Sequence, residues 1–263
     1  MYEDYETLDI ERNGGILTVA FNRPDVRNAT NPTMHRELER IFPEIGRDPD
    51  TNVVILTGRG KCFSAGGDIS QMQKSVDDRA RWIEAMAEAK RILDGLLALD
   101  RPVIAKINGH AIGLGATLAL FCDITIADES AKIADPHVKV GLVAGDGGSI
   151  IWPALIGYAR AKRYLFTGEP ITGRQAAEIG LVSEATASDA LDARVNAIAA
   201  EMNAGAAHAI RLTKRAVNLS LRAQVDALID AHLGFETMSY LTDDHREAVN
   251  AFTEGRTPVF KGK

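Results

Sequence analysis

Two glycine-rich turns constrain this chain more than any other feature of its sequence. They cover residues 63–68 (FSAGGD) and 109–117 (GHAIGLGAT), and each follows a β-branched apolar run, at 53–57 and 103–107. Each also precedes a segment with a helical pattern. Glycine permits positive φ angles and a close approach to the backbone. Two such turns can aim backbone N–H groups from separate strands at one point, which is how an oxyanion hole is built.

Length and charge limit the class of protein. A chain of 263 residues suits one large domain, or one domain with an extension. Its net charge of −6 provides no electrostatic footprint for nucleic acid or an anionic membrane. Cys62 and Cys122 have neither metal-ligand nor disulfide-framework spacing. No signal-peptide pattern or long apolar run is visible, so we expect a cytoplasmic protein with no membrane or nucleic-acid partner.

The order of the expected elements indicates the α/β class. Residues 7–22 alternate into a hairpin with its turn at 13–15, and strands are expected at 53–57, 103–107, 124–126 and 132–133. Helical periodicity covers 31–46, 77–99, 149–166 and 173–180. Strands that alternate with helices are typical of α/β folds. From about residue 189 the pattern is almost entirely helical, which predicts a core at 1–188 and a helical region at 189–263.

A series of landmarks runs along nearly the whole chain in a fixed order and spacing. They are FNRP at 21–24 with RNA at 27–29, the turn at 61–68, RPVIA at 101–105, NG at 108–109, CD at 122–123, LFTG at 165–168, and the segments 177–182 and 252–263. In these landmarks the chain resembles the crotonase (enoyl-CoA hydratase/isomerase) superfamily. The resemblance implies a spiral of ββα repeats with a CoA-thioester site at 1–188. It also implies a helical C-terminal region at 189–263 that packs on the core and on a neighbouring subunit, in a homotrimer or a dimer of trimers.

The resemblance also assigns chemistry to the two turns. Members of the superfamily bind an acyl-CoA thioester and stabilise an enolate or related oxyanion at its carbonyl. By motif position, the two donors are the backbone N–H groups of Gly67 and Leu114. Tight packing alone is the competing explanation for the glycines, whereas a dinucleotide fingerprint is a poor match because Leu118 stands where the third glycine would fall. Coenzyme A would be part of the substrate, and no separate cofactor or metal is expected.

The sequence departs from the superfamily at the acid and base. The two glutamates of a 2-enoyl-CoA hydratase would fall at Thr117 and His137. A threonine hydroxyl can orient water but is no useful base near neutral pH, whereas histidine titrates there. The sequence therefore predicts acid and base groups other than the paired glutamates. For His137, the alternative is a hydrogen-bonded histidine in the pocket wall.

Asp146 is the second candidate for proton transfer. It stands among glycines at 145–148, in a loop where several relatives with altered chemistry carry a catalytic aspartate. The register is one residue off, because in that pattern the aspartate would occupy the position of Gly145. The alternative is a turn former or a helix N-cap, since a helix is expected to begin just after Asp146.

The remaining site residues are implied by the resemblance. Arg27 and Ala29 would flank the path of the pantetheine and phosphates, while Ala65, Asp68 and Ile69 would form the wall near the adenine. Lys261 would reach the nucleotide phosphates of a neighbouring subunit, with a solvated surface lysine as the alternative. The favoured function is that of a lyase or isomerase acting through a thioester enolate. The alternatives are a hydrolase or decarboxylase on the same scaffold, and a CoA-thioester-binding protein with little catalysis.

Overall fold

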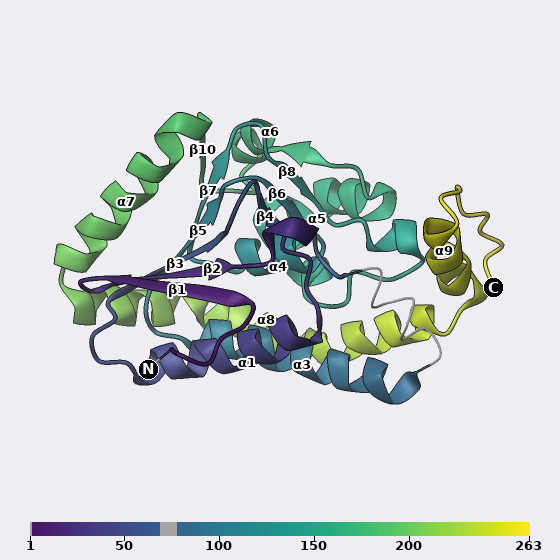
Figure 1. Ribbon diagram of the computed structural model, residues 1–263, viewed down its shortest axis with the longest axis horizontal. Helices are drawn as coiled ribbons and strands as arrows, with labels where there is room; N and C mark the ends of the chain where they lie inside the picture. The colour runs from purple at the N-terminus through teal and green to yellow at the C-terminus, as the bar shows by residue number, and fades with distance from the viewer. Residues whose placement is uncertain (1, 69–77) are drawn as a thin grey trace.

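The computed structural model describes residues 2–68 and 78–263, and these residues form two sheets surrounded by helices (Figure 1). The larger sheet has the order β1-β2-β3-β5-β7-β10 and the smaller one β4-β6-β8-β9. This arrangement confirms the α/β prediction. The strands of the larger sheet are β1 (Leu8–Asn13), β2 (Ile16–Phe21), β3 (Val53–Gly58), β5 (Val103–Ile107), β7 (Ile124–Asp128) and β10 (Glu184–Thr186).

The larger sheet begins with the expected hairpin and continues as a parallel sheet. In the hairpin, β1 pairs antiparallel with β2, and Asn13 stands opposite Ile16. The remaining neighbours in this sheet pair in parallel. Parallel strands are covered on both faces, which explains why residues 53–56 of β3 and 103–105 of β5 are continuous apolar runs rather than alternating ones.

The two faces of the larger sheet pack against different elements. Along β3, Val54 and Leu56 belong to the main core, whereas Val53 and Ile55 belong to a second cluster. That cluster includes Leu191, Val195 and Ala199 of α7 (Ser188–Ala204). Successive side chains of a strand point to opposite faces, so this division follows from the strand period of two. The helix α7 thus covers one face of the sheet (Figure 1).

The smaller sheet positions the glycine-rich turns. Its strands are β4 (Cys62–Ser64), β6 (His110–Ile112), β8 (Lys132–Ala134) and β9 (Ile171–Thr172). The first three are parallel to one another and are neighbours in the order β4-β6-β8. Their carboxyl ends therefore meet at one edge, and the segments that follow residues 64, 112 and 134 lie together there.

Helices enclose the sheets on the remaining sides. They are α1 (Pro32–Arg47), α3 (Arg79–Ala98), α4 (Leu114–Leu120), α5 (Gly148–Thr167), α6 (Gly173–Glu178), α8 (Ala207–Tyr240) and α9 (Asp243–Thr253), with 3-10 turns η1 (Pro24–Val26) and η2 (His137–Val140). The side chain of Asn31 caps α1 by accepting a hydrogen bond from the Met34 N–H at 2.9 Å. Figure 1 shows α1, α3 and α8 side by side along one edge of the molecule.

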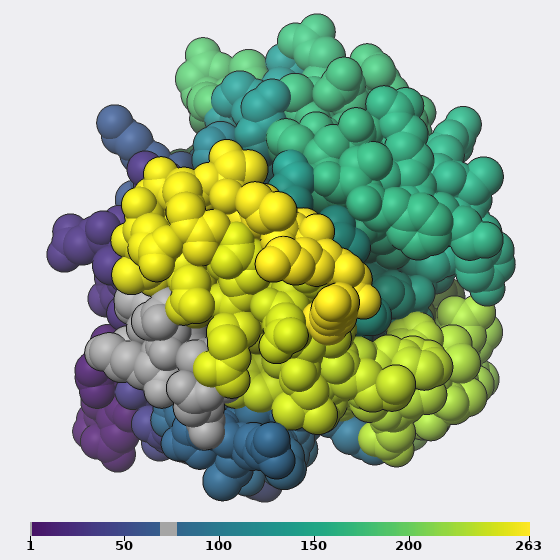
Figure 2. Space-filling model, turned by 90° about the vertical axis from the view of Figure 1, so that its right-hand side faces the viewer, coloured from purple at the N-terminus to yellow at the C-terminus, as the bar shows by residue number. Residues whose placement is uncertain are grey.

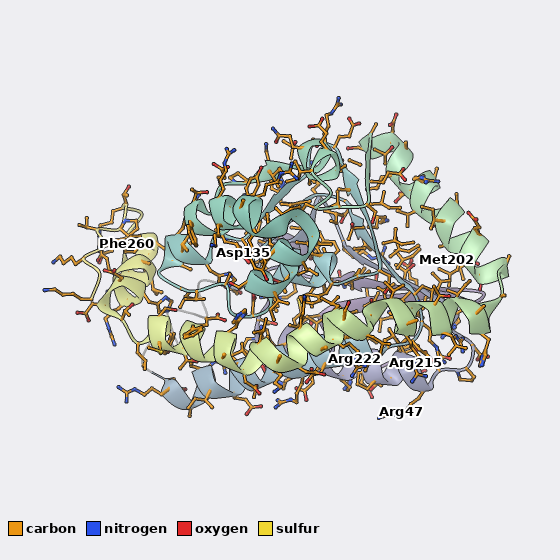
Figure 3. The ribbon with its side chains drawn as sticks, turned by 180° about the vertical axis from the view of Figure 1, so that it is seen from behind. Arg47, Asp135, Met202, Arg215, Arg222 and Phe260 are labelled. Carbon is orange, nitrogen blue, oxygen red and sulfur yellow. The ribbon has the colours of Figure 1, made fainter. Side chains whose placement is uncertain are left out.

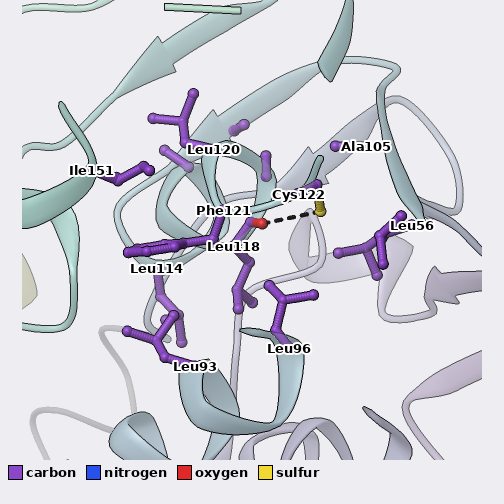
Figure 4. Packing of buried hydrophobic residues seen from close by; sticks show 14 of the residues in the cluster. Leu56, Leu93, Leu96, Ala105, Leu114, Leu118, Leu120, Phe121, Cys122 and Ile151 are labelled. Carbon is purple, nitrogen blue, oxygen red and sulfur yellow. Dashed lines mark hydrogen bonds between the residues drawn. The ribbon is translucent and has the colours of Figure 1, made fainter. Parts of the chain in front are cut away.

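The main core anchors the short helix α4 and the turn that precedes it. Leu93 and Leu96 of α3 pack in one cluster with Leu114, Leu118 and Phe121 (Figure 4). All five side chains are buried. Burying a leucine or phenylalanine side chain contributes about 1.5–3 kcal/mol relative to leaving it exposed. This packing holds the first residue of α4 in place at the edge of the smaller sheet.

The C-terminal helices close one end of the molecule. Figure 2 shows α9 and the C-terminal residues, in yellow, between the surfaces of α3 and the region of α5. The backbone N–H of Lys261 donates to Asp244 Oδ1 at 2.6 Å, which ties the last residues to α9. In the described part of the chain, none of the helices combines the length and the apolar character that crossing a membrane requires.

Candidate active site

A cavity of about 420 Å³ opens at the edge where β4, β6 and β8 end. Both glycine-rich turns line it, through residues 65–68 and 112–114. Side chains of α1, α3, η2, α8 and α9 complete its wall. Figure 3 shows Asp135, which directly follows β8, in the interior of the molecule on the side of α8. The cavity thus lies where the parallel strands of the smaller sheet end.

The two turns touch each other at their glycines. Gly66 has φ +81°, and a Cβ atom built there would lie 2.6 Å from the carbonyl oxygen of Ile112. Gly113 has φ +54°. A larger residue at position 66 would therefore need both an unfavourable backbone conformation and space occupied by the other turn. Close packing of the turns is a structural reason for glycine, and it brings the two backbones together.

Two residues whose backbone N–H groups were predicted as donors, Gly67 and Leu114, lie at this contact. Thr30 donates its N–H to Gly66 O at 2.7 Å and accepts from the Asp68 N–H at 3.1 Å, a bridge that does not use the N–H of Gly67. Leu114 is the first residue of α4, where an N–H has no acceptor within the helix. Both Gly67 and Leu114 line the cavity. The turns therefore hold two hydrogen-bond donors beside it.

His137 lies between two buried aspartates. Its Nδ1 is 2.5 Å from Asp135 Oδ1, and its Nε2 is 3.8 Å from Asp146 Oδ2. Asp135 reaches this position because it follows β8, and Asp146 because it precedes α5 by two residues. The two ring nitrogens face different carboxyl groups, so the imidazole ring lies between Asp135 and Asp146 and contacts both.

Burial and neighbouring charges shift the pKa values of His137 and Asp146. Burial alone would lower the pKa of His137, but the charges of Asp135 and Asp146 and the hydrogen bond to Asp135 raise it well above its usual range. Burial raises the pKa of Asp146, while the charge of His137 opposes that rise. The raised pKa of His137 favours its imidazolium form at neutral pH, and the carboxyl group of Asp146 lies beside it with a raised pKa of its own. Such a pair contains both a proton donor and a proton acceptor.

Thr117 holds the carboxyl group of Asp146. Its hydroxyl donates to Asp146 Oδ1 at 3.3 Å, and the backbone N–H of Gly148 also bonds this carboxylate. Thr117 is completely buried and is not part of the cavity wall. The N-cap of α5 is Gly147, so the expectation of Asp146 as the cap itself is wrong. Asp146 instead directs its carboxyl group toward His137 and lines the cavity.

Glu236 also belongs to the cavity wall, although the sequence did not predict it as a site residue. This side chain of α8 is 3% exposed and lines the same cavity. Burial raises the pKa of Glu236 to about 8, with further increases from Asp146 and Asp135. A signal was present in the sequence, because α8 buries positions at helical spacing and a glutamate occupies one of them. The buried stripe is Val225, Ile229, Leu233, Glu236 and Tyr240.

The other expected site residues divide into two groups. Ala65 and Asp68 line the cavity, and the Asp68 carboxylate is paired with Arg23 at 3.3 Å. Arg27, Ala29 and Lys261 are not among the residues of the cavity wall. Arg27 still contacts the first turn, since its carbonyl accepts from the Ala65 N–H at 2.9 Å. Ile69 lies outside the described residues.

The aspartates and His137 also have a spacing that a metal ion could use, although the sequence predicted no metal site. One ligand atom from each of Asp135, His137 and Asp146 lies within 4.8 Å of the others. A single ion can bind only one nitrogen of an imidazole ring, and Nδ1 is already hydrogen-bonded to Asp135. The three side chains therefore form an acid–base group, in which His137 is hydrogen-bonded to Asp135 and lies 3.8 Å from Asp146.

Comparison with known proteins agrees with the resemblance seen in the sequence. The family model for enoyl-CoA hydratase/isomerase matches residues 11–263. The chain is 32% identical to a crotonyl-CoA hydratase of Syntrophomonas wolfei, over 98% of this chain and 99% of that protein. It is 33% identical to a short-chain-enoyl-CoA hydratase of Clostridium acetobutylicum, over 94% of each. A crystal structure of an enoyl-CoA hydratase/isomerase from Mycobacterium paratuberculosis superimposes with a TM-score of 0.90 at 35% identity, covering 94% of this chain and 99% of that one.

Proposed function

The chain belongs to the enoyl-CoA hydratase/isomerase family, and from that premise we propose that it is a lyase or isomerase that converts an acyl-CoA thioester through an enolate. The observation that carries the proposal is the pair of His137 and Asp146, which stands in a cavity with two backbone N–H donors on another part of its wall. The family assignment supports the substrate class. The pair supports acid and base groups that differ from two glutamates.

The backbone donors would hold the thioester carbonyl. In this proposal the N–H groups of Gly67 and Leu114 both bond the carbonyl oxygen, which gains negative charge as the enolate forms. The helix dipole of α4 adds a partial positive charge at Leu114. Losing one such donor typically costs about 3–4 kcal/mol of transition-state stabilisation.

The side chains would move the protons. Asp146 in its ionised form accepts a proton from the substrate or from an attacking water, and His137 supplies the balancing proton. In a hydration, the hydroxide part of water adds to the β carbon, its proton goes to Asp146, and the α carbon gains a proton from His137. In an isomerisation, one carbon loses a proton and another carbon gains one. Asp135 orients the imidazole and Thr117 orients Asp146.

The nucleotide half of the substrate would follow the first turn. Ala65 and Asp68 lie at the cavity and Arg27 beside it, which supports a path for pantetheine along this edge. We propose Arg27, Ala29 and Ile69 as further contacts along that path, and Lys261 as a contact to the phosphates of a neighbouring subunit. Coenzyme A would enter as part of the substrate, with no additional cofactor.

Hydrolysis of the thioester is the second candidate. Asp135 bonds Nδ1 of His137 and so fixes the ring, an arrangement that can serve a histidine acting on water. Against it, the two flanking carboxyl groups keep His137 in its protonated form at neutral pH, in which it cannot accept a proton. Hydrolysis would release free CoA, which separates it from hydration and isomerisation.

One experiment distinguishes these reactions. The purified protein is incubated with saturated, unsaturated and aromatic acyl-CoAs in heavy water, and mass spectrometry then scores added water, deuterium at the α carbon, free CoA and loss of carbon dioxide. We expect α-carbon deuteration or addition of water, and neither in Asp146→Asn. If no thioester is bound or changed, the proposed function is wrong.

We also propose that the chain assembles as a homotrimer or a dimer of trimers. Large apolar side chains are exposed on α5 and α8, which supports burial against another copy. Among them are Tyr158 and Phe166 on α5, and Val217 and Leu219 on α8, each about 70% exposed. Light scattering coupled to size-exclusion chromatography would measure the mass, and a monomer of 28.4 kDa would contradict the proposal.

A further inference from the structure

Glu236 fills a place directly against the turn that carries Asp146. A Cβ atom built on Gly145 would lie 2.4 Å from the carbonyl oxygen of His232 and 2.8 Å from Glu236 Oε2. No side chain fits at position 145, because α8 and the Glu236 carboxyl group already occupy that space. The residue next in sequence is Asp146. The tertiary structure therefore places a carboxyl group of α8 beside the proposed base.

The surroundings of the Glu236 carboxyl group disfavour its ionised form. Glu236 Oε2 is buried and has no hydrogen-bond partner among the described residues, and the nearby backbone N–H of Gly145 donates to the carbonyl oxygen of Val143 at 2.8 Å. An ionised carboxylate that has lost water without gaining partners is costly, whereas the protonated acid costs much less. The geometry thus favours the neutral form of Glu236.

Among the surrounding charges, that of His137 lowers the pKa of Glu236, whereas those of Asp146 and Asp135 raise it and so favour the neutral acid. Asp135, Asp146 and Glu236 supply three carboxyl groups, and His137 is the one imidazolium among the groups that influence Glu236. Ionised Glu236 would add a negative charge close to Asp146 and Asp135, which both raise its pKa. Two neighbouring histidines are held neutral, because burial lowers the pKa of both His232 and His245. The other charged side chains of the cavity wall are Asp68, which is paired with Arg23, Arg36 of α1, and Arg81, Glu84 and Glu88 of α3.

We propose that Glu236 is a positioning residue of this site: a neutral carboxylic acid that lets Asp146 remain ionised beside His137 and that sets the alkaline limit of catalysis. The proposal rests on the function proposed above. Its energetic basis is that a buried site of fixed size tolerates few like charges. Because the thioester gains negative charge as the enolate forms, ionised Glu236 would oppose that step. Burial raises the pKa of Glu236 to about 8, which places the limit just above neutral pH.

The pH profile of turnover tests this role. Glutamine has the shape of the neutral acid and cannot ionise, so Glu236→Gln keeps the packing of the site and removes only this ionisation. The wild-type kcat/KM falls about tenfold per pH unit above pH 8, the slope of one ionisation, whereas Glu236→Gln extends the plateau by about one pH unit or more. A structural role alone would leave the profile unchanged. The proposal is overturned if Glu236→Gln keeps the wild-type limit, or if it folds and binds thioester but is inactive at every pH.

A matched variant controls for the exchange of an acid for an amide. Asp94 on α3 is half-buried, burial raises its pKa, and it lies outside the cavity wall. Asp94→Asn is expected to keep both the activity and the alkaline limit of the wild type. If Asp94→Asn extends the plateau as Glu236→Gln does, the effect is not specific to the site and the proposal fails.

A second measurement does not depend on turnover. Protein labelled with ¹³C at the glutamate carboxyl carbon is titrated by NMR, and the resonance missing from Glu236→Gln identifies residue 236. We expect that resonance to titrate near pH 8. Titration below about pH 5.5 overturns the proposal, because the ordinary value of glutamate is about 4.3. If it titrates near 8 while no acyl-CoA is converted, the neutral acid is established and the proposed function of the chain has failed instead.

Discussion

The cavity has two kinds of wall, and they differ in how far they depend on pH and on the identity of single side chains. In the proposed site one wall is backbone, formed by Gly67 and Leu114 in the turns that follow β4 and β6. The other is made of side chains: His137, Asp146 and Glu236 from η2, the turn before α5, and α8. A peptide N–H does not titrate in the range of protein stability and does not depend on the identity of its own side chain. The acid and base groups depend on both identity and pH.

This difference explains how one fold can serve several reactions. In this chain the backbone wall depends on the pairing of β4 with β6 and on the glycines of the two turns, so it belongs to the fold. A side-chain wall can be rebuilt by substituting single residues, as at Thr117 and His137, without altering the sheets. We infer that the backbone wall determines which part of a substrate is held, and that the side-chain wall determines which reaction follows.

The largest effect is expected at the side-chain wall, from Asp146→Asn. Asparagine keeps the size of the side chain and can still accept from Thr117, but it cannot take up a proton. Removing a general acid or base typically costs about 10²–10⁴ in rate, so we expect turnover to fall about 10³-fold with thioester affinity unchanged. Steady-state kinetics and calorimetric titration with a substrate analogue measure the two quantities. Turnover within tenfold of wild type would remove Asp146 from the proposed role.

A smaller loss is expected when the backbone wall is distorted, as in Gly66→Ala. The new Cβ would meet Ile112 O at 2.6 Å in a backbone with φ +81°, which separates the two turns and misplaces the donors. Turnover should fall about 10²-fold at every pH, near the cost of one oxyanion donor. A pH-independent loss distinguishes this wall from the other. If the variant instead changes only the pH optimum, the comparison between the walls does not hold.

The free energy of unfolding of Glu236→Gln, compared with that of wild type, should change with pH in a defined direction. Between its usual pKa of 4.5 and the folded-state pKa of about 8, wild-type Glu236 keeps a proton that the unfolded chain has lost. Wild-type stability therefore falls as pH rises through this window, whereas the glutamine of the variant binds no proton in either state and contributes equally at every pH. The advantage of Glu236→Gln over wild type should grow by about 2 kcal/mol from pH 5 to pH 8, less than the full shift because of relaxation. Urea unfolding at pH 5, 7 and 9 measures it, and a difference independent of pH would argue against a buried neutral acid.

The smallest effect is expected at Leu114, although it belongs to the proposed oxyanion hole. Leu114→Met keeps the N–H and roughly the volume of the side chain, so stability should change by less than about 1.5 kcal/mol. Turnover should stay within about twofold, as measured in the same kinetic assay. A loss comparable to that of Gly66→Ala would show that the side chain, and not only the N–H, acts on the substrate.

The sequence predicted the long elements of the fold well and the short ones poorly. The hairpin with its turn at 13–15, the helices α1 and α5, and the strand β3 were expected within one or two residues of their observed bounds. The short strands β4, β6 and β9 were not expected. They are two or three residues long, too short for any periodicity, and they exist because neighbouring strands pair with them.

The same division applies to the site. His137 and Asp146 could be singled out because motifs of the resembled superfamily mark their positions along the chain. No motif indicated a role for Asp135 or Glu236, and Glu236 lies 90 residues beyond Asp146 in the sequence. Its position on the buried stripe of α8 was a local signal for an unusual glutamate, but it did not indicate what the glutamate would face.

The sequence by itself determined the α/β class, the family, and the two turns whose glycines allow a backbone wall. These depend on local patterns and on glycine's freedom at positive φ, and both can be seen along the chain. Only the tertiary structure decided that His137 joins two aspartates and that a carboxyl group of α8 lies against them. Charges interact through space, and burial depends on packing between distant elements, so the protonation of this site emerges only once the chain is folded.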